Sequence, residues 1–340
     1  MKILVTGAAG FICGYLIEEL LQAGHSVTGL DNYSKYGRVK KSYDSNPAYR
    51  LVEGDAKDVV LLKELISDCD HFVAAAAWIG GISYFHELAY DLLAENERIT
   101  AAAFDAAIWA HQHRQLQKIT IISSSMVFES TQEFPPPEGA VRRSPPPRST
   151  YGFQKLATEY FAQGAYEQYG LPYTIARPFN CVGVGETRAL RNHDIYSGNV
   201  ELAMSHVVPD LVQKTLKGQD PLHILGSGEQ VRHYTYGGDL ARGIRLCIES
   251  PAALCQDFNL STPAPTTVLE LARLIWTKVN GASKPLSFVT DPAYEYDVQM
   301  RSPDTTKAER LLGFRATTSL SKILDEVIPW VAEEIHAGQL

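Results

Sequence analysis

The first fourteen residues constrain the fold of this 340-residue chain more than any other segment. An apolar run at residues 3–5 predicts a short strand, and a turn with Gly7 and Gly10 leads into a helical pattern that begins at Phe11 and Ile12. Glycine lets the backbone turn tightly at such a junction, and the unpaired amides at the helix start then face a pyrophosphate. A strand, turn and helix of this kind are typical of proteins that hold a dinucleotide.

An acidic residue stands at the end of the next apolar run, about 20 residues further on, where a dinucleotide site needs one. Asp31 closes residues 26–30, and Asn32 follows it. The carboxylate of Asp31 would accept the hydroxyls of the adenosine ribose and repel a 2′-phosphate, which favours NAD over NADP. The glycine-rich turn by itself also fits a flavodoxin-like or purely structural strand–turn–helix.

Composition and charge exclude several other classes of protein. The net charge is -8 and the sequence pI is about 5.7, without any long basic block, which argues against nucleic acid as a partner. No apolar run reaches the roughly 18 residues of a membrane span, and the N-terminus predicts a strand rather than a signal peptide. Five scattered cysteines fit free thiols in a reducing cytoplasm. His111 and His113 diverge on a predicted helix, so we expect no metal site.

Strand and helix patterns alternate through the first half of the chain. The predicted strands are 2–6, 26–30, 50–53, 70–75, 118–123 and 173–176, and the predicted helices are 11–23, 57–67, 88–113 and 152–169. This alternation predicts an α/β fold of the Rossmann type, a doubly wound parallel sheet with its ligand at the carboxyl ends of the strands.

The alternation fades after about residue 180. The predicted strands there are 222–225, 232–236 and 257–260, and the predicted helices are 203–217, 239–249, 268–279 and 319–335. We expect residues 1–179 to bind NAD and residues 180–340 to form a smaller α+β substrate lobe, with some return of the chain to the first domain. Two proline triplets between residues 134 and 147 predict a surface loop.

Further cofactor contacts are predicted at the ends of the third and fourth strands. Asp55 would bond the adenine amino group, and the small side chains of residues 74–77 would let the dinucleotide lie close. Tight packing of a helix on the strand explains those alanines equally well. The predicted NAD contacts are Gly7, Gly10, Phe11, Ile12, Asp31, Asn32, Asp55, Ala56, Ala75, Ala76 and Lys155.

A phenol and an ammonium stand four residues apart, on one face of a predicted helix, at Tyr151 and Lys155. A tyrosine with a pKa near 10 is a poor base at neutral pH. A nearby lysine and the positive nicotinamide ring would stabilise the phenolate and lower that pKa. One such spacing is expected by chance in a chain with 17 tyrosines, so its position after the fifth strand of a dinucleotide sheet carries the prediction.

Three serines, residues 123–125, end the fifth strand, where a hydroxyl lies beside the nicotinamide. It can hydrogen-bond the substrate oxygen that Tyr151 deprotonates, and we expect Ser124 in this role, with Ser125 as the alternative. One or two of the three serines bond their own backbone at the strand end. The predicted catalytic residues are therefore Tyr151, Lys155 and Ser124.

These motifs together resemble the extended short-chain dehydrogenase/reductase family, and within it the NAD-dependent nucleotide-sugar epimerases and dehydratases such as UDP-glucose 4-epimerase. The similar segments are TGAAGFI, GD at 54–55, the alanine run, SSS, YGFQK, RPFN at 177–180, GSGEQVRHYTY at 226–236 and RSPDTTKAERLLGF at 301–314. They cover nearly the whole chain in the family's order.

The resemblance implies a nucleotide diphosphate sugar, with a UDP-sugar favoured, between the two lobes. Asn180 would contact its phosphates, His206 would line the nucleotide pocket, and Arg232 and Arg301 would clamp the diphosphate. Two guanidinium groups suit the charge and geometry of a diphosphate, although each arginine alone also fits a surface ion pair. The implied substrate contacts are Ser124, Ser125, Tyr151, Asn180, His206, Arg232 and Arg301. The resemblance also implies a homodimer through the helices at 88–113 and 152–169, whose apolar residues are alternatively buried within one subunit.

The chain departs from the family pattern at several positions. Cys13 replaces the third glycine of the turn, so the helix must pack around a thiol or shift to use Gly14. A 4,6-dehydratase of this family would carry an acid and a base where Ser125 and Met126 stand, and a 3,5-epimerase would carry a cysteine at Met126. Gly80-Gly81 nevertheless resembles the GDP-mannose 3,5-epimerases.

The remaining set needs only a base, a hydroxyl and NAD, which predicts a 4-epimerase. Tyr151 would take the proton of the sugar C4 hydroxyl while NAD takes the C4 hydride, and the 4-keto sugar would turn and receive the hydride on its other face. Oxidative decarboxylation of a UDP-uronate uses the same first step and stays open, as do a 4-keto-forming dehydratase, a 3,5-epimerase and a ketoreductase. A non-catalytic dinucleotide sensor would not need this combination of side chains.

Overall fold

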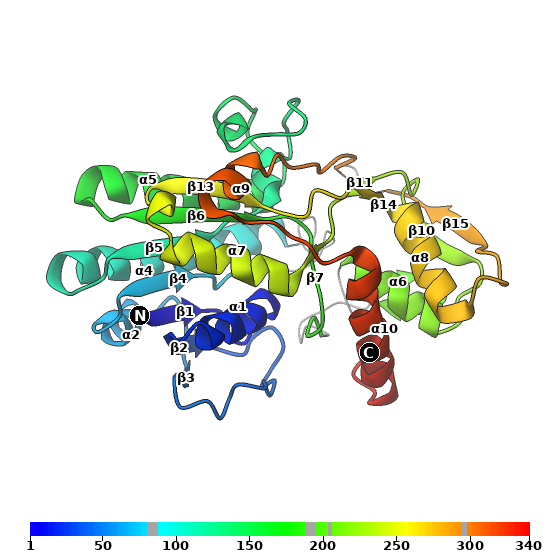
Figure 1. Cartoon of the computed structure of the whole chain (residues 1–340), viewed down its shortest axis with the longest axis horizontal. Helices are drawn as coiled ribbons and strands as arrows, with labels where there is room; N and C mark the ends of the chain where they lie inside the picture. The colour runs from blue at the N-terminus through cyan, green and yellow to red at the C-terminus, as the bar shows by residue number, and fades with distance from the viewer. Residues whose placement is uncertain (80–87, 188–194, 203–205, 294–297) are drawn as a thin grey trace.

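A seven-stranded parallel sheet forms the centre of the molecule (Figure 1). The computed structural model describes residues 1–79, 88–187, 195–202, 206–293 and 298–340, so Gly80-Gly81 lies outside the described residues. In spatial order the strands are β13 (Gln256–Leu260), β6 (Tyr173–Pro178), β5 (Lys118–Ile122), β4 (His71–Ala74), β1 (Lys2–Thr6), β2 (Ser26–Asp31) and β3 (Tyr49–Glu53). The chain runs outward from β1 to β3 and then returns to β4, so the order reverses at β1, where such sheets bind their ligands.

Helices cover both faces of this sheet, as the alternating pattern predicts. The helices are α1 (Phe11–Gln22), α2 (Val59–Ile66), α4 (Ala89–His113), α5 (Thr150–Tyr169), α7 (Gly237–Glu249) and α9 (Thr306–Leu312). Ile3 and Val5 of β1 face the core under α1 and α7, whereas Leu4 faces the core under α2, α4 and α5. This alternation follows from the two-residue period of a strand. The doubly wound α/β fold is confirmed.

A second core lies beyond the carboxyl ends of the strands. It is built from α6 (Val207–Leu216), α8 (Val268–Asn280) and α10 (Leu320–His336), with β10 (Leu222–Leu225) paired to β15 (Phe288–Asp291). Three short strand pairs lie outside the central sheet: β7 (Cys181–Val182) with β12 (Thr235–Tyr236), β11 (Val231–Arg232) with β14 (Thr266–Thr267), and β8 (Ile195–Ser197) with β9 (Val200–Leu202). The cavity between the two parts is therefore bounded by the sheet on one side and by α6 on the other.

Segments from the second half of the chain return to the sheet. β13 pairs with β6, and α7 packs against α1, so both extend the dinucleotide domain. The division at residue 179 stays a proposal. The strand predicted at 232–236 is two strands, because β11 pairs with β14 and β12 pairs with β7.

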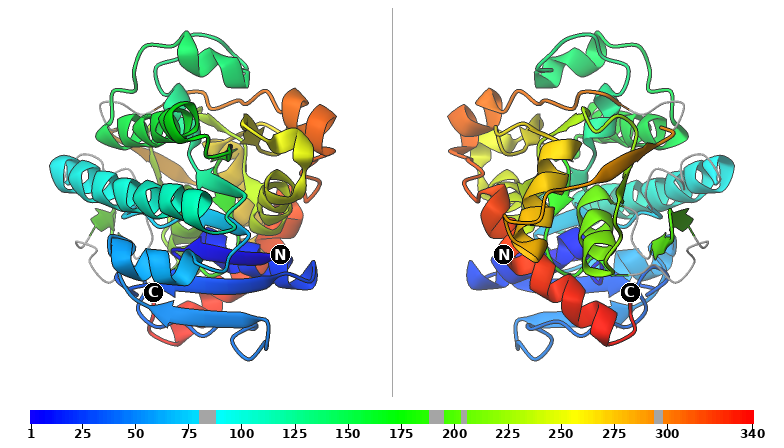
Figure 2. Two further views of the ribbon diagram at one scale, coloured as in Figure 1. Left: turned by 90° about the vertical axis from the view of Figure 1, so that its left-hand side faces the viewer. Right: turned by 90° about the vertical axis from the view of Figure 1, so that its right-hand side faces the viewer.

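Other differences from the predicted elements are local. β3 ends at Glu53, so Asp55 lies beyond the strand end, and α2 begins two residues late because the Asp58 carboxylate caps it. Residues 134–147 stand out from the body in Figure 2, but they contain a 3₁₀ helix whose Ala140 is buried. Within the described part of the chain, no helix is both long and apolar enough to cross a membrane.

Candidate active site

One cavity of about 1300 Å³ runs from the carboxyl ends of the strands to α6. All of the residues that the sequence predicts for the cofactor, the substrate and the chemistry line this cavity. Ligand sites commonly have volumes of about 300–1,000 Å³, so this one has room for two ligands in contact. The structure thus brings the predicted residues together, and their individual roles stay predictions.

The glycine-rich turn lies so close to the segment after β4 that only glycine fits at position 7. Gly7 has a φ of +73°, and a Cβ there would lie 2.9 Å from the Cα of Ala76. The hydroxyl of Thr6 accepts the backbone N–H groups of Ala75 and Ala76 at 3.2 Å, which ties the end of β1 to the end of β4. The turn after β1 and the alanines that follow β4 therefore form one close-packed surface, and we expect the dinucleotide to lie against it.

Asp31 holds the same turn from the other side. Its carboxylate accepts N–H groups from Ala9 at 3.0 Å and Tyr33 at 2.7 Å, so the end of β2 is joined to the turn. Burial raises the pKa of Asp31 although those hydrogen bonds oppose the shift. An anionic acceptor in this place fits the ribose hydroxyls of NAD.

The helix start packs around a thiol, which settles the question that Cys13 raised. The thiol of Cys13 is buried in the core under α1, with its Sγ 3.9 Å from the carbonyl oxygen of Thr6. Burial raises its pKa to about 12, so it stays protonated. All five cysteines of the chain are free.

Tyr151 lies in the first turn of α5 and faces the cavity. Ser149 caps this helix by accepting the N–H of Gly152 at 3.0 Å, which fixes where the helix starts. Tyr151 is buried and joined to Ser124 by a hydrogen bond, while the Ser124 hydroxyl also accepts the N–H of Met126 at 3.2 Å. The base and the hydroxyl that the sequence predicts are therefore in contact.

The electrostatics of Tyr151 differ from the expectation. Burial raises its pKa, and the groups that oppose this shift are the Ser124 hydrogen bond and the charge of Arg301 rather than Lys155. The ammonium of Lys155 lies 5.9 Å from the centre of the Tyr151 ring and donates to the carbonyl oxygen of Ile122 at 2.9 Å. Burial lowers the pKa of Lys155 to about 8, and Glu159 opposes that shift.

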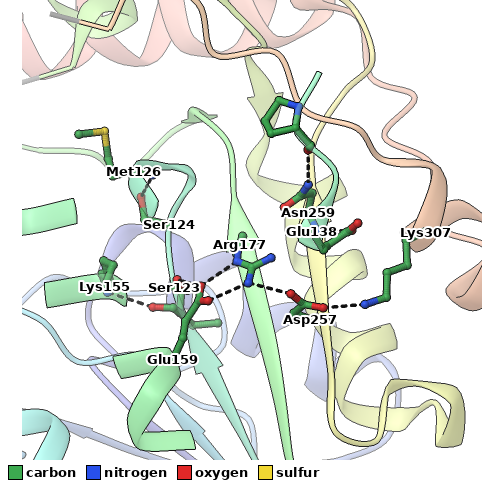
Figure 3. Close-up of polar contacts among 12 residues, drawn as sticks. Ser123, Ser124, Met126, Glu138, Lys155, Glu159, Arg177, Asp257, Asn259 and Lys307 are labelled. Carbon is green, nitrogen blue, oxygen red and sulfur yellow. Dashed lines mark hydrogen bonds and ion pairs between the residues drawn. The ribbon is translucent and has the colours of Figure 1, made fainter. Parts of the chain in front are cut away.

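A chain of charges, buried at Glu159 and Arg177, lies next to the predicted catalytic side chains (Figure 3). Glu159 accepts a hydrogen bond from Ser123 at 2.6 Å and two from Arg177, both at 2.7 Å. Arg177 also pairs with Asp257 at 2.8 Å, and Asp257 pairs with Lys307 at 2.6 Å. The sequence reasoning missed this chain, although the four-residue spacing from Lys155 to Glu159 was a usable signal.

Three of the residues predicted to contact the phosphates of the substrate, Asn180, Arg232 and Arg301, line the cavity. Val231 links the two arginines, because its carbonyl oxygen accepts a side-chain N–H of Arg232 at 2.9 Å and the backbone N–H of Arg301 at 3.2 Å. Asn180 has a φ of 38°, and its carbonyl oxygen accepts the backbone N–H of Thr235, the first residue of β12, at 3.0 Å. These contacts place three of the predicted phosphate contacts on one side of the cavity.

Several acidic residues that line the cavity were not predicted, and two of them, Glu186 and Asp210, have shifted pKa values. Glu186 is buried and pairs with His206. Burial raises the pKa of Glu186, but the charge and hydrogen bond of His206 and the charge of Lys35 together lower it below its usual value. Asp210 lines the cavity from α6, and its pKa is raised by burial despite the opposing charge of Lys214. Glu186 lies in a loop and Asp210 in the first turn of α6, and neither belongs to a sequence motif that predicts its position. Among the described residues, no group of three His, Cys, Asp or Glu side chains could hold a metal ion.

The fold and this site define a dinucleotide-binding α/β protein, with the predicted serine, tyrosine and lysine together in its cavity. A model of the NAD dependent epimerase/dehydratase family matches residues 3–261. The chain belongs to this family of extended short-chain dehydrogenases/reductases, which confirms both the resemblance and NAD as the cofactor. The family comprises nucleotide-sugar epimerases, decarboxylases and dehydratases.

Individual relatives are distant but cover almost the whole chain. The chain is 27% identical over 340 residues to a UDP-N-acetyl-alpha-D-glucosaminuronate decarboxylase of Bacillus cytotoxicus, with 98% of each chain covered. It is 27% identical to an uncharacterized UDP-glucose epimerase of Bacillus subtilis, with 100% of each covered. Among solved structures, UDP-glucose 4-epimerase of Thermotoga maritima with UDP-glucose has a TM-score of 0.80 at 26% identity, with 98% of this chain and 100% of that chain covered.

Proposed function

We propose that this protein is a NAD-dependent nucleotide-sugar 4-epimerase. The observation that carries the proposal is the contact of Tyr151 with Ser124 in the cavity, with Ser125 and Met126 beside them. Neither Ser125 nor Met126 can transfer a proton at neutral pH, so this part of the site supports removal of a hydroxyl proton and no additional acid–base step.

Each side chain then has one task in the reaction. Tyr151 takes the proton of the C4 hydroxyl and later returns it, while Ser124 hydrogen-bonds the same oxygen. Lys155 holds a positive charge 5.9 Å from the centre of the Tyr151 ring, and Arg301 acts on the phenol from the substrate side. Bound NAD supplies the acceptor and donor of the hydride at C4. Arg232 and Arg301 hold the diphosphate of the substrate, a UDP-sugar, and leave the sugar free to turn between the two transfers.

Decarboxylation of a UDP-uronate is the second candidate function. Similarity to the decarboxylase of Bacillus cytotoxicus supports it, at the same identity as the epimerase of Bacillus subtilis. A 4-keto uronate loses CO₂ readily, so the same first step serves both reactions. The two functions differ in whether the substrate keeps its carboxylate.

One incubation separates these functions. The purified protein with its bound NAD is offered UDP-glucose, UDP-N-acetylglucosamine or UDP-glucuronate, and the products are followed by NMR together with CO₂ release and NADH absorbance. An epimerase equilibrates the C4 epimers without net NADH or CO₂. Release of CO₂ from the uronate identifies the decarboxylase. UDP-N-acetylglucosaminuronate is offered in a fourth incubation because the relative in Bacillus cytotoxicus is named for it, and failure to convert any of the four contradicts both functions. Tyr151→Phe is the inactive control.

A homodimer through α4 and α5 is also proposed. Phe104 is buried and stacks on Phe161 within one subunit, whereas Tyr160 is 63% exposed and Phe153 and Tyr166 are about half exposed. Side chains of this size on one helix suit a protein interface. Light scattering after size exclusion tests it: a dimer is expected for the wild type and a monomer for Tyr160→Glu/Tyr166→Glu.

A further inference from the structure

Glu159 lies one turn along α5 from Lys155 and is almost fully buried. Its position behind the reaction centre gives it no access to the cavity, since it is not among the residues that line it. Every strong contact of its carboxylate is instead to protein groups: the hydroxyl of Ser123 and the guanidinium of Arg177. A buried carboxylate is costly unless it is paired in this manner.

Glu159 therefore contacts one of the two elements that the proposed reaction needs and acts on the other through its charge. Through Ser123 it holds the end of β5, where Ser124 follows directly in the chain. Through its charge it acts on Lys155, whose ammonium has a backbone carbonyl as its hydrogen-bond acceptor. Without a negative charge nearby, a buried ammonium loses its proton more easily.

We propose that Glu159 is a positioning residue: its carboxylate, hydrogen-bonded to Ser123 and Arg177, orients the strand end that carries Ser124 and places a negative charge one helix turn from Lys155. This inference deepens the proposed function, because it assigns the residue that keeps Lys155 charged beside Tyr151. Arg177 holds Glu159 in turn by a two-point contact, and Asp257 and Lys307 complete an alternation of charge from the reaction centre to α9 (Figure 3).

The charged groups around Lys155 come from several elements. Glu159 is on α5 itself, Arg177 is on β6, Asp257 is on β13 and Lys307 is on α9. Arg301 acts on Tyr151 from the substrate side. Among these, Glu159 is the group whose charge raises the pKa of Lys155 against the lowering effect of burial. Removing Asp257 leaves that charge in place and changes only the outer half of the chain.

The test measures Lys155 directly. Lysines are labelled with ¹³C at Cε, the Lys155 resonance is assigned by its absence in Lys155→Met, and its titration is followed by NMR. We expect the resonance to titrate near pH 8 in the wild type, and about one pH unit lower in Glu159→Gln. The matched control is Asp257→Asn, which removes the other carboxylate of Arg177 and should leave the Lys155 titration unchanged.

The outcomes are distinct. A Glu159→Gln protein that is folded, by its thermal melt, and titrates as the wild type does would overturn the proposal, as would an equal shift in Asp257→Asn. If Glu159→Gln does not fold, Glu159→Gln/Arg177→Met removes the buried pair together, and the same lowered titration is expected. The titration needs no substrate, so it remains decisive even if no nucleotide sugar is converted. Where turnover is found, the pH above which it declines should fall by the same amount in Glu159→Gln.

Discussion

Gly7 and Ala76 touch across the end of the sheet: a Cβ on Gly7 would lie 2.9 Å from the Cα of Ala76. The contact joins the turn after β1 to the segment after β4, on either side of the point where the strand order reverses. Backbone lies against backbone here, so no side-chain rotation can relieve a clash.

Gly7→Ala should therefore abolish NAD binding. The added methyl group meets Ala76, and the φ of +73° is strained for any residue with a Cβ. Gly24→Ala is the matched control, because Gly24 has a φ of +82° with nothing within 4 Å of the added Cβ. We expect the control to lose about 1 kcal/mol of stability from strain alone and to bind NAD normally by calorimetry. Unchanged NAD binding by Gly7→Ala would contradict the proposal that NAD lies against the surface formed by this turn and the alanines after β4.

Tyr151→Phe should bind NAD and nucleotide sugar but lose turnover by about 10³-fold, the effect expected when a general base is removed. The ring fills the same buried space, so the melting temperature should change little. Tyr160→Phe, on the exposed face of the same helix, is the control and should keep its rate. Turnover is measured as conversion of whichever nucleotide sugar proves to be the substrate. A Tyr151→Phe protein with the wild-type rate would remove the phenol from the mechanism.

Asp31→Asn should weaken NAD binding and reduce the discrimination against NADP. The amide no longer repels a 2′-phosphate, and it is a poorer acceptor for the ribose hydroxyls and for the N–H groups of Ala9 and Tyr33. We expect the ratio of the two dissociation constants to change by at least about tenfold, the effect of roughly 1.4 kcal/mol. Glu53→Gln, at the end of the neighbouring strand, should leave this ratio alone. If the ratio of the dissociation constants for NAD and NADP also stays constant in Asp31→Asn, another group selects between the two cofactors.

The parts of the fold and site that sequence predicted are those with a local pattern. The alternation of strand and helix up to β6, the glycine turn, Asp31 and the tyrosine–lysine spacing are all legible within about 20 residues of chain. Tyr151 and Ser124 could be paired because parallel strands end at one edge of a sheet.

The remaining features depend on contacts between distant segments. β13 looked like a strand of the second lobe, yet it pairs with β6 because Phe258 and Leu260 complete the core under α7. The pair of Arg177 with Asp257, and that of Glu186 with His206, have no periodicity that would reveal them. The effect of burial on the pKa values of Tyr151 and Lys155 could not be predicted from the sequence either, because desolvation depends on the groups that the fold places around each side chain.

Lys155→Met should make the protein more stable and inactive. Burial lowers the pKa of Lys155 from 10.5 to about 8, so the ammonium is disfavoured in the folded state relative to the unfolded state. Below pH 8 Lys155 is protonated in both the folded and the unfolded state, so the full free-energy cost of burying its charge is present. Between pH 8 and 10.5 the unfolded chain binds more protons, so wild-type stability should rise with pH over this window. Methionine removes the charge but also leaves the carbonyl of Ile122 without its donor, so we expect a net gain of about 1–2 kcal/mol in the free energy of unfolding at pH 7.

Urea unfolding at pH 7 and 9.5 measures this change in stability, with the exposed Lys322→Met as control. A Lys155→Met protein less stable than the wild type at pH 7 would contradict this prediction, because the hydrogen bond and packing of the lysine would then outweigh the cost of burying its charge.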